Sequence, residues 1–167
     1  GVTYNSGTGK ITVPSGVTSF SVLVDTTDDA VIENAETLIV TVGGVAGTGT
    51  ITDNDTQSVS SVTAEDNGNL GASDSTVVEG KTLKYTVALS GASPNATEYT
   101  FALSGSAASS DYEGIANFTF SDGVTYNSGT GKITVPSGVT SFSVLVDTTD
   151  DAVIENAETL IVTVGGV

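Results

Sequence analysis

The segment Lys81–Leu89 reads KTLKYTVAL and alternates apolar with polar side chains. Its apolar face consists of Leu83, Tyr85, Val87 and Leu89. A period of two is typical of a strand that buries one face. Similar alternation recurs at 99–103, 118–120, 142–146 and 160–164, between clusters rich in Gly, Ser, Asn and Pro that favour turns. The sequence therefore predicts an all-β fold, an antiparallel β-sandwich, without helices.

The chain also contains an exact internal repeat. Residues 123–167 match residues 1–45 without a difference, which predicts a tandem array. The first copy continues through AGTGTITDND at residues 46–55. We therefore expect residues 1–56 to be the C-terminal half of one repeat, and residues 57–167 to be the next repeat without its last strand. Strand exchange between molecules, or folding back of residues 47–52, would complete that repeat, and neighbouring repeats of the same chain are the expected partners.

The composition limits the chemistry of the chain. Asp and Glu number 20 against 4 Lys, and the net charge is −16. Nucleic acid and anionic membrane surfaces are therefore not expected as partners, because both need basic side chains. No apolar run reaches membrane-spanning length, so membrane insertion is not expected either. The chain has no His, Cys, Met or Trp, which leaves oxygen atoms as the available metal ligands.

Negative charge is concentrated in one short segment that occurs twice. The segment DTTDDAVIENAE spans residues 25–36 and again 147–158, with five carboxylates in each copy. It follows one predicted strand and precedes another, so it is a loop at the end of a sheet. Crowded carboxylates repel one another unless a cation or solvent relieves them. Ca²⁺ fits best because it accepts six to eight oxygen ligands, Mg²⁺ ranks second, and a solvated acidic loop is the alternative without a metal.

The order of these elements resembles a known family. Glu79-Gly80 precedes the LKYTVAL strand, Ser110-Asp111-Tyr112 follows TFALSG, and FTF lies at 118–120. Then come VLVDTTDDAVIENAETLIVTV and, in the preceding copy, GTGTITDND. This pattern resembles the Calx-beta domain, an immunoglobulin-like sandwich of sodium–calcium exchangers and of long repetitive bacterial surface adhesins of the RTX or biofilm type. The acidic loop does not have the spacing of an EF-hand.

The resemblance implies a set of calcium ligands at the joint between consecutive domains. For residues 57–167 the implied ligands are Glu79, Asp111, Asp150, Asp151, Glu155 and the backbone carbonyl of Val153. For the preceding repeat they are Asp28, Asp29, Val31, Glu33 and the closing Asp53 and Asp55. Asp147, Glu158, Asp25 and Glu36 are either further ligands or caps of the strand ends. Glu65 and Asp66 are candidates to reach the same joint from the following domain.

The resemblance and the exact repeat together favour a structural role outside the cell. We expect a calcium-stabilised extender repeat of an adhesin on the bacterial cell surface, made rigid by Ca²⁺ at the domain ends and joints. The alternatives are a calcium-dependent glycan-binding module and a calcium sensor. An enzyme is not expected, although Asp111 and Glu155 could pair as in a glycosidase. Tyr99, Tyr112 and Tyr126 are expected to pack within or beside strands rather than to form a sugar platform.

Overall fold

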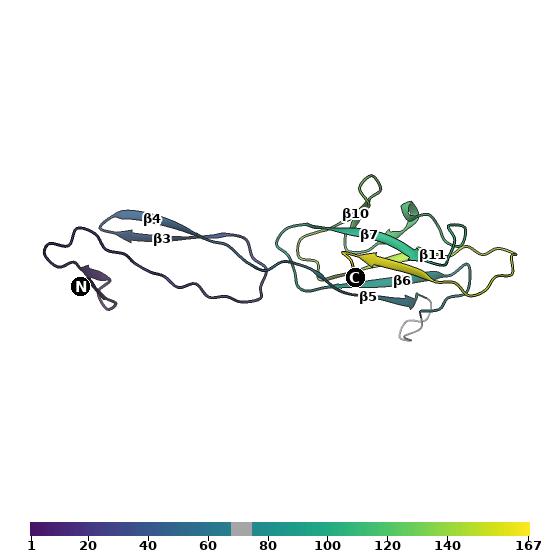
Figure 1. The fold of residues 1–167 in the computed structure, drawn as a ribbon, viewed down its shortest axis with the longest axis horizontal. Coiled ribbons are helices and arrows are strands. Elements are labelled where there is room, and N and C mark those ends of the chain that lie inside the picture. The colour runs from purple at the N-terminus through teal and green to yellow at the C-terminus, as the bar shows by residue number, and fades with distance from the viewer. Residues whose placement is uncertain (68–74) are drawn as a thin grey trace.

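A computed structural model describes residues 1–67 and 75–167. Two parts lie end to end along one long axis (Figure 1), an arm of residues 1–56 and a sandwich of residues 57–167. The arm contains β1 (Thr3–Asn5), β2 (Lys10–Thr12), β3 (Glu36–Val42) and β4 (Val45–Ile51). The sandwich contains β5 (Val59–Asp66), β6 (Thr82–Leu89), β7 (Thr97–Gly105), β8 (Thr119–Phe120), β9 (Thr125–Asn127), β10 (Lys132–Val135), β11 (Ser141–Asp147) and β12 (Leu160–Val164).

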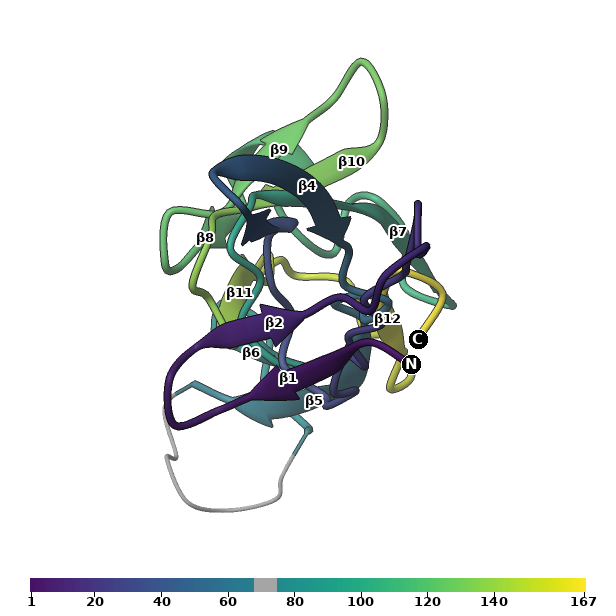
Figure 2. The same ribbon diagram turned by 90° about the vertical axis from the view of Figure 1, so that its left-hand side faces the viewer.

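The sandwich consists of two antiparallel sheets. One has the strand order β5-β6-β11-β8 and the other has the order β12-β7-β10-β9. Among the described residues the helical element is a single 3-10 turn at Ile115–Asn117. The prediction of an all-β antiparallel sandwich is therefore confirmed. Viewed along the long axis, the edge strands β5 and β12 lie on the same side of the molecule (Figure 2).

The core lies between the two sheets and uses the alternating residues that the sequence indicated. The predicted face of β6 is buried at all four positions, from Leu83 to Leu89. Val87 and Val144 are both 0% exposed. Phe101 meets Phe118 and Phe120 edge to face, with ring centroids 6.4 and 5.4 Å apart. Tyr85 is buried as well, which raises its pKa to about 12 and keeps its hydroxyl a donor, to the Leu160 carbonyl at 2.7 Å.

The two exact copies of the repeat occupy different environments. Phe142, Val144 and Val146 are 2%, 0% and 0% exposed, whereas the matching Phe20, Val22 and Val24 are 39%, 50% and 54% exposed. Strand β11 is hydrogen-bonded between β6 and β8, while residues 17–24 of the arm are assigned to no strand. Alternation alone therefore does not make this sequence a strand. It needs neighbouring strands to pair with and a second sheet to cover its apolar face.

The arm joins the sandwich through a short polar junction. The Gln57 side-chain amide donates to the carbonyls of Gly91 and Val139, at 2.8 and 3.0 Å, and its oxygen accepts from the Tyr99 hydroxyl at 3.2 Å. The Asn95 amide donates to Asn34 Oδ1 at 2.8 Å. Asn34 belongs to the acidic segment 25–36, so this segment lies against the sandwich.

The duplicate positions allow a matched test of the core. We expect Val144→Ala to lower the free energy of unfolding by about 2 to 3 kcal/mol, since it leaves a cavity between the sheets. Val22→Ala, in identical local sequence, should change it by less than about 0.5 kcal/mol, as at other exposed sites. Chemical denaturation of both variants measures the difference. Equal effects at the two positions would contradict the different environments of the two copies.

Candidate metal centre

Three chain segments meet at the end of the sandwich farthest from the arm, which we call the sandwich pole: residues 79–81, 106–113 and 147–159 (Figure 1). Thr148 clasps Lys81, because its backbone N–H and its hydroxyl both donate to the Lys81 carbonyl, at 2.9 and 2.8 Å. The Thr149 N–H donates to the Asp111 carbonyl at 2.9 Å. These bonds hold the acidic loop beside the Asp111 segment. Antiparallel pairing of β6 with β11 therefore determines where the loop begins.

Gly80 allows the acidic loop to approach the first of these segments. Its φ is +73°, a conformation that side chains disfavour. A Cβ at this position would lie 3.0 Å from the Cβ of Asp150. A larger residue would therefore push Asp150 away from Glu79 and its neighbours. The Glu79-Gly80 element thus combines an acidic side chain with the glycine needed for close packing.

Carboxyl groups crowd one another at the sandwich pole. A hydrogen bond between the Asp111 and Glu158 side chains lowers the pKa of Asp111 and raises the pKa of Glu158. Partial desolvation raises the pKa of Glu155, and the negative charges of Asp111, Asp151 and Glu79 add to this effect. Five acidic groups from three segments therefore act on one another at this pole.

A second group of acidic side chains lies in the arm, next to its junction with the sandwich. We call residues 25–36 and 53–55 the joint pole. Asp53 accepts from the N–H of Glu33 at 2.8 Å and from the N–H of Asp55 at 3.0 Å, and these bonds lower the pKa of Asp53. The Asn54 amide donates to Asp28 Oδ1 at 3.0 Å. Partial desolvation raises the pKa of Asp55, and the charges of Asp53, Asp28 and Asp29 raise it further.

The closing segment Asp53-Asn54-Asp55 thus lies across the acidic loop of its own repeat. A cavity of about 250 Å³ separates them and is lined by acidic and amide side chains, including Glu33 and Glu36. The joint pole also touches the next repeat, through the bond between Asn34 and Asn95. Segments from distant parts of the repeat therefore meet where the arm and the sandwich join.

Several predicted ligands lie at the edges of these groups. The Asp147 carboxylate accepts a short hydrogen bond from the Thr82 hydroxyl, as expected of a residue at a strand end. Val153 and Val31 are 59% and 58% exposed, and their N–H groups donate to Asp151 and Asp29 respectively. Asp25 is exposed at the beginning of its loop.

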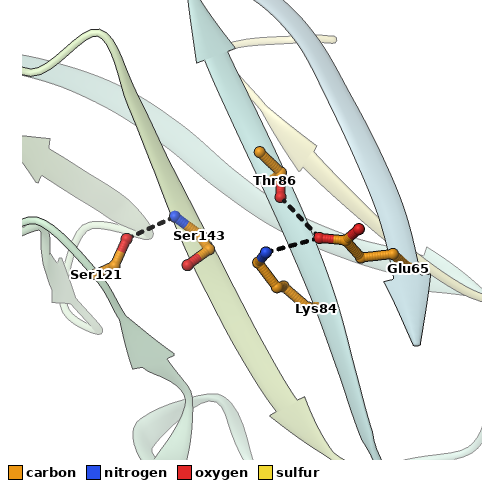
Figure 3. Close-up of polar contacts among 5 residues, drawn as sticks. All are labelled: Glu65, Lys84, Thr86, Ser121 and Ser143. Atoms are coloured by element: carbon orange, nitrogen blue, oxygen red, sulfur yellow. Dashed lines mark hydrogen bonds and ion pairs between the residues drawn. The ribbon is translucent and has the colours of Figure 1, made fainter. Parts of the chain in front are cut away.

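Glu65 and Asp66, named above only as candidates to reach the joint, do not lie there. Strand β5 begins at Val59, next to the joint, and its last residue Asp66 lies opposite Leu83. Glu65 Oε1 lies 2.7 Å from Lys84 Nζ and accepts from the Thr86 hydroxyl at 3.3 Å (Figure 3). The acidic pair fails to reach the joint because β5 carries it along the full length of the sheet. In the same close-up, Ser121 Oγ accepts from the Ser143 N–H at 2.7 Å and ties β11 to the residue that follows β8.

The donor atoms at both poles suit calcium, although they are not arranged as a finished site. Within the described residues, no group of three or more His, Cys, Asp or Glu side chains is close enough to hold a metal ion. The available donors are nevertheless all oxygen atoms, which Ca²⁺ prefers and softer metals do not. The opposite pKa shifts of Asp111 and Glu158 are the response expected of crowded carboxyl groups. The residues present therefore fit calcium by chemistry.

Sequence reasoning missed three features of this region. The Asn54 amide bridges to the acidic loop, and the signal for it was its place between two closing acids. The Thr148 clasp on Lys81 had no signal, because it depends on which strands pair. A cavity of about 540 Å³ at the sandwich pole is lined by acidic residues such as Glu79, Asp111 and Glu155 and also by the apolar residues Leu83 and Leu160.

The fold and the two acidic poles define a class, an antiparallel β-sandwich module with oxygen-rich loops at its ends. The family model described as the Calx-beta domain matches residues 1–68 and 104–166, and the chain belongs to this family. The match is consistent with a calcium-related module. No curated protein and no solved structure matches the chain. In the described part of the chain, no helix has the length and hydropathy needed to cross a membrane.

Carboxyl titration by NMR tests the crowding at the sandwich pole. In EDTA we expect Glu155 and Glu158 to titrate above the ordinary Glu value, and Asp111 below the ordinary Asp value. Glu65 serves as an internal reference of opposite sign, because the hydrogen bond from Lys84 lowers its pKa. Replacement by Asp111→Asn should return the pKa of Glu158 towards the ordinary value. Ordinary values for Glu155 and Glu158 in the unsubstituted chain would show that these acids do not interact.

Proposed function

We propose that this chain is a calcium-stabilised extender repeat of a bacterial cell-surface adhesin, with Ca²⁺ at the ends of the domains and at the joints between them. The observation that carries the proposal is the joint pole. There the closing Asp53-Asn54-Asp55 lies across the acidic loop of its repeat, and Asn34 of that loop bonds Asn95 of the next. A cation held here would contact the segment Asp53-Asn54-Asp55, which ends one repeat. It would also lie close to the hydrogen bond between Asn34 and Asn95, which links this repeat to the following one.

At the joint pole, Asp28, Asp29, Glu33, Asp53 and Asp55 would hold the ion. Calcium supplies the positive charge that this group lacks. The N–H groups of Glu33 and Asp55 already orient the Asp53 carboxylate. Asp55 is followed directly by Thr56 and Gln57, and Gln57 is held to the sandwich by three hydrogen bonds. Fixing Asp55 would therefore restrict how the arm moves relative to the sandwich.

At the sandwich pole, the corresponding ligands are Glu79, Asp111, Asp150, Asp151 and Glu155, with the Val153 carbonyl and Glu158 as further oxygen donors. Asp147 and its counterpart Asp25 mark the beginning of each acidic loop, and Glu36 marks the end of the arm's loop. A bound Ca²⁺ would tie the loop to the segments at 79–81 and 106–113, in addition to the backbone hydrogen bonds that hold it there.

Rigidity outside the cell follows from the affinity range of such sites. Extracellular calcium modules have Kd values of about 10⁻⁴ to 10⁻³ M, so the poles fill outside a cell and empty inside it. The exact duplication of residues 1–45 supports a repeated spacer whose partners are neighbouring repeats of the same chain. The net charge of −16 argues against nucleic-acid partners, and a spacer needs neither catalysis nor membrane insertion.

The glycan-binding alternative receives less support from the aromatic residues. Tyr99 donates its hydroxyl to Gln57 at the junction. Tyr112 packs against Phe118 with ring centroids 6.3 Å apart, and Tyr126 packs against Phe101 at 5.8 Å. These rings hold the sandwich together and are not arranged as a platform for a sugar. A calcium sensor would use the same poles, but an exact repeat is better explained by length than by signalling.

A calcium titration with EDTA reversal tests the proposal directly. At a hundredfold excess of Ca²⁺ over Kd, each filled site should stabilise the folded state by about 2.7 kcal/mol. The melting temperature should rise, and the maximum dimension in small-angle X-ray scattering should increase as the junction stiffens. Mg²⁺ at the same concentration should have a smaller effect, because it tolerates fewer ligands and retains its water. If calcium alters neither quantity, the acidic loops are solvated surface and the proposal is wrong.

Substitutions at the two poles should separate stability from stiffness. We expect Asp53→Asn with Asp55→Asn to remove the calcium-dependent change in length and to preserve most of the rise in melting temperature. Asp151→Asn with Glu155→Gln should do the reverse. Glu98→Gln is the control for loss of a single carboxylate elsewhere, because Glu98 forms a surface ion pair with Lys132 on β7 and β10, away from both poles. Loss of both responses in the control would show that net charge, and not a site, is responsible.

A further inference from the structure

The loop between β6 and β7, residues 90–95, lies at the end of the sandwich that faces the arm (Figure 1), and we call it the receiving loop. Two side chains of the acidic segment in the arm contact it. The Asn95 amide donates to Asn34 Oδ1 at 2.8 Å. Cδ1 of Ile32 lies 3.8 Å from the position that a Cβ would take at Gly91. The acidic segment therefore meets the next sandwich through one apolar and one amide side chain, and neither of them is a carboxylate.

The surroundings of Ile32 differ from those of its duplicate, whereas the residue before it is equally exposed in both copies. Val31 and the matching Val153 are 58% and 59% exposed. Ile32 is partly buried, and the matching Ile154 at the sandwich pole is 100% exposed. Because the local sequences are identical, the difference reflects what each copy packs against, and for Ile32 this includes the backbone of Gly91.

The receiving loop is held in shape by hydrogen bonds within its own sandwich. Ser93 is 8% exposed, its carbonyl accepts from the Gly138 N–H at 2.9 Å, and its Oγ accepts from the Asn95 N–H at 3.2 Å. The Ser90 N–H donates to the Ser58 carbonyl at 2.9 Å, and the Ser58 N–H donates to Ser90 Oγ at 3.0 Å. None of these groups is charged. The bonds that shape the loop therefore do not depend on a cation.

From these contacts we infer that the receiving loop is a docking surface for the acidic segment of the preceding repeat, and that this contact orients the two domains without calcium. Ile32 supplies the apolar contact, Asn34 supplies a directional hydrogen bond, and the bare backbone at Gly91 leaves room for the Ile32 side chain. The Gly91 carbonyl also accepts from the Gln57 amide at 2.8 Å. The docked side chain and the covalent connection between the domains thus converge on one residue.

The inference goes beyond the proposed function, because it assigns the direction of the joint to uncharged groups. It rests on that proposal only in treating residues 1–56 and 57–167 as parts of consecutive repeats. One partly buried side chain and one exposed amide pair make a weak contact, so in EDTA the domains dock for only part of the time. A cation at the joint pole would lengthen the docked time by offsetting the repulsion within the acidic segment. Calcium would therefore limit the motion of a joint whose direction is already set.

Cross-linking of introduced thiols tests the docked arrangement, because the chain has no cysteine of its own. Asn34→Cys with Asn95→Cys places two thiols at side chains that now bond each other at 2.8 Å. Asn156→Cys with Asn95→Cys is the matched control, since Asn156 has the same place in the second copy of the acidic segment. Asn34 precedes Asn95 by 61 residues and Asn156 follows it by 61 residues, so chain length alone favours neither pair.

The reaction is run in EDTA with 1 M NaCl, where the Debye length is about 3 Å and the acidic side chains are screened. We expect a short bismaleimide to bridge positions 34 and 95 within one molecule about tenfold faster than positions 156 and 95, because docking raises the local concentration of the first pair. Mass spectrometry of the monomer measures both rates. Equal rates for the two pairs would overturn the inference.

The apolar contact is tested in the background of the 34 and 95 thiols. Ile32→Ala should slow their cross-linking about threefold or more, because it removes the side chain that lies on Gly91. Ile154→Ala, in identical local sequence, should leave the rate unchanged. The melting temperature of the sandwich verifies that both variants are folded. Equal slowing by the two substitutions would show that Ile32 has no special part in docking.

Gly91 offers a second pair of substitutions in the same background. Its backbone is not in the left-handed region, and a Cβ there would be in ordinary van der Waals contact with Ile32. Gly91→Ala should therefore preserve the cross-linking rate. Gly91→Glu should slow it about threefold or more at low salt, since it adds a carboxylate facing the acidic segment. Equal rates for these two variants would contradict the docked arrangement.

The unsubstituted chain allows a direct measurement. With the isoleucine δ1 methyl groups labelled, NMR in EDTA should show a nuclear Overhauser effect between the Ile32 methyl group and the α protons of Gly91. The Ile154 methyl group should show none to Gly91. Absence of the Ile32 signal in EDTA would overturn docking without calcium.

The cross-linking rates with and without Ca²⁺ separate this inference from the proposed function. Fast bridging of positions 34 and 95 in EDTA supports docking even if calcium alters neither the melting temperature nor the length. Fast bridging that requires Ca²⁺ would support the calcium function and overturn orientation by uncharged groups. Equal rates for the two thiol pairs in every condition would overturn docking, while the calcium titration is judged separately.

Discussion

The pairing of β6 with β11 is the interaction on which the rest of the structure depends. Its register runs from Ser141 opposite Ala88 to Asp147 opposite Thr82, and it buries the apolar faces of both strands against the second sheet. The arm shows what happens without it. Residues 19–25 have the sequence of β11, yet with no counterpart of β6 beside them they form no strand and leave Phe20 and Val22 substantially exposed.

The same pairing creates the crowding of charge at the sandwich pole. Because Asp147 ends opposite Thr82, the loop that follows begins next to Lys81 and Glu79. The backbone bonds from Thr148 and Thr149 then bring Asp151, Glu155 and Glu158 towards Asp111. Hydrophobic burial and strand pairing therefore supply the free energy that holds like charges together. A cation held there, as proposed, would offset this repulsion, and a ligand that binds only the folded state stabilises the whole domain.

Much of the fold could be predicted from the sequence, because a period of two directly reports which side chains face a core. Leu83, Tyr85, Phe142 and Val144 were identified in this way. The acidic loops were equally visible, since charge density is a local property. The features that were missed depend on pairing between distant segments. The direction of β5, which carries Glu65 to Lys84, was one of these, and the cavity bordered by Leu160 was another.

In a continuous array, the strand that completes one sheet is also the strand that leads into the next repeat. Residues 45–51 pair with β3, Asp53 and Asp55 follow at the acidic loop, and Gln57 is bonded to the next sandwich immediately afterwards. When the strand at residues 45–51 pairs with β3, it therefore completes the sheet. The same pairing places Asp53 and Asp55 at the joint pole and sets where the following domain begins. Gly47 and Gly49 leave the inward face of that strand largely without side chains, so Ile51 and the acids after it provide most of its specific contacts. In the proposed array, the segment that pairs with β3 is thus also the segment that leads into the joint with the following domain.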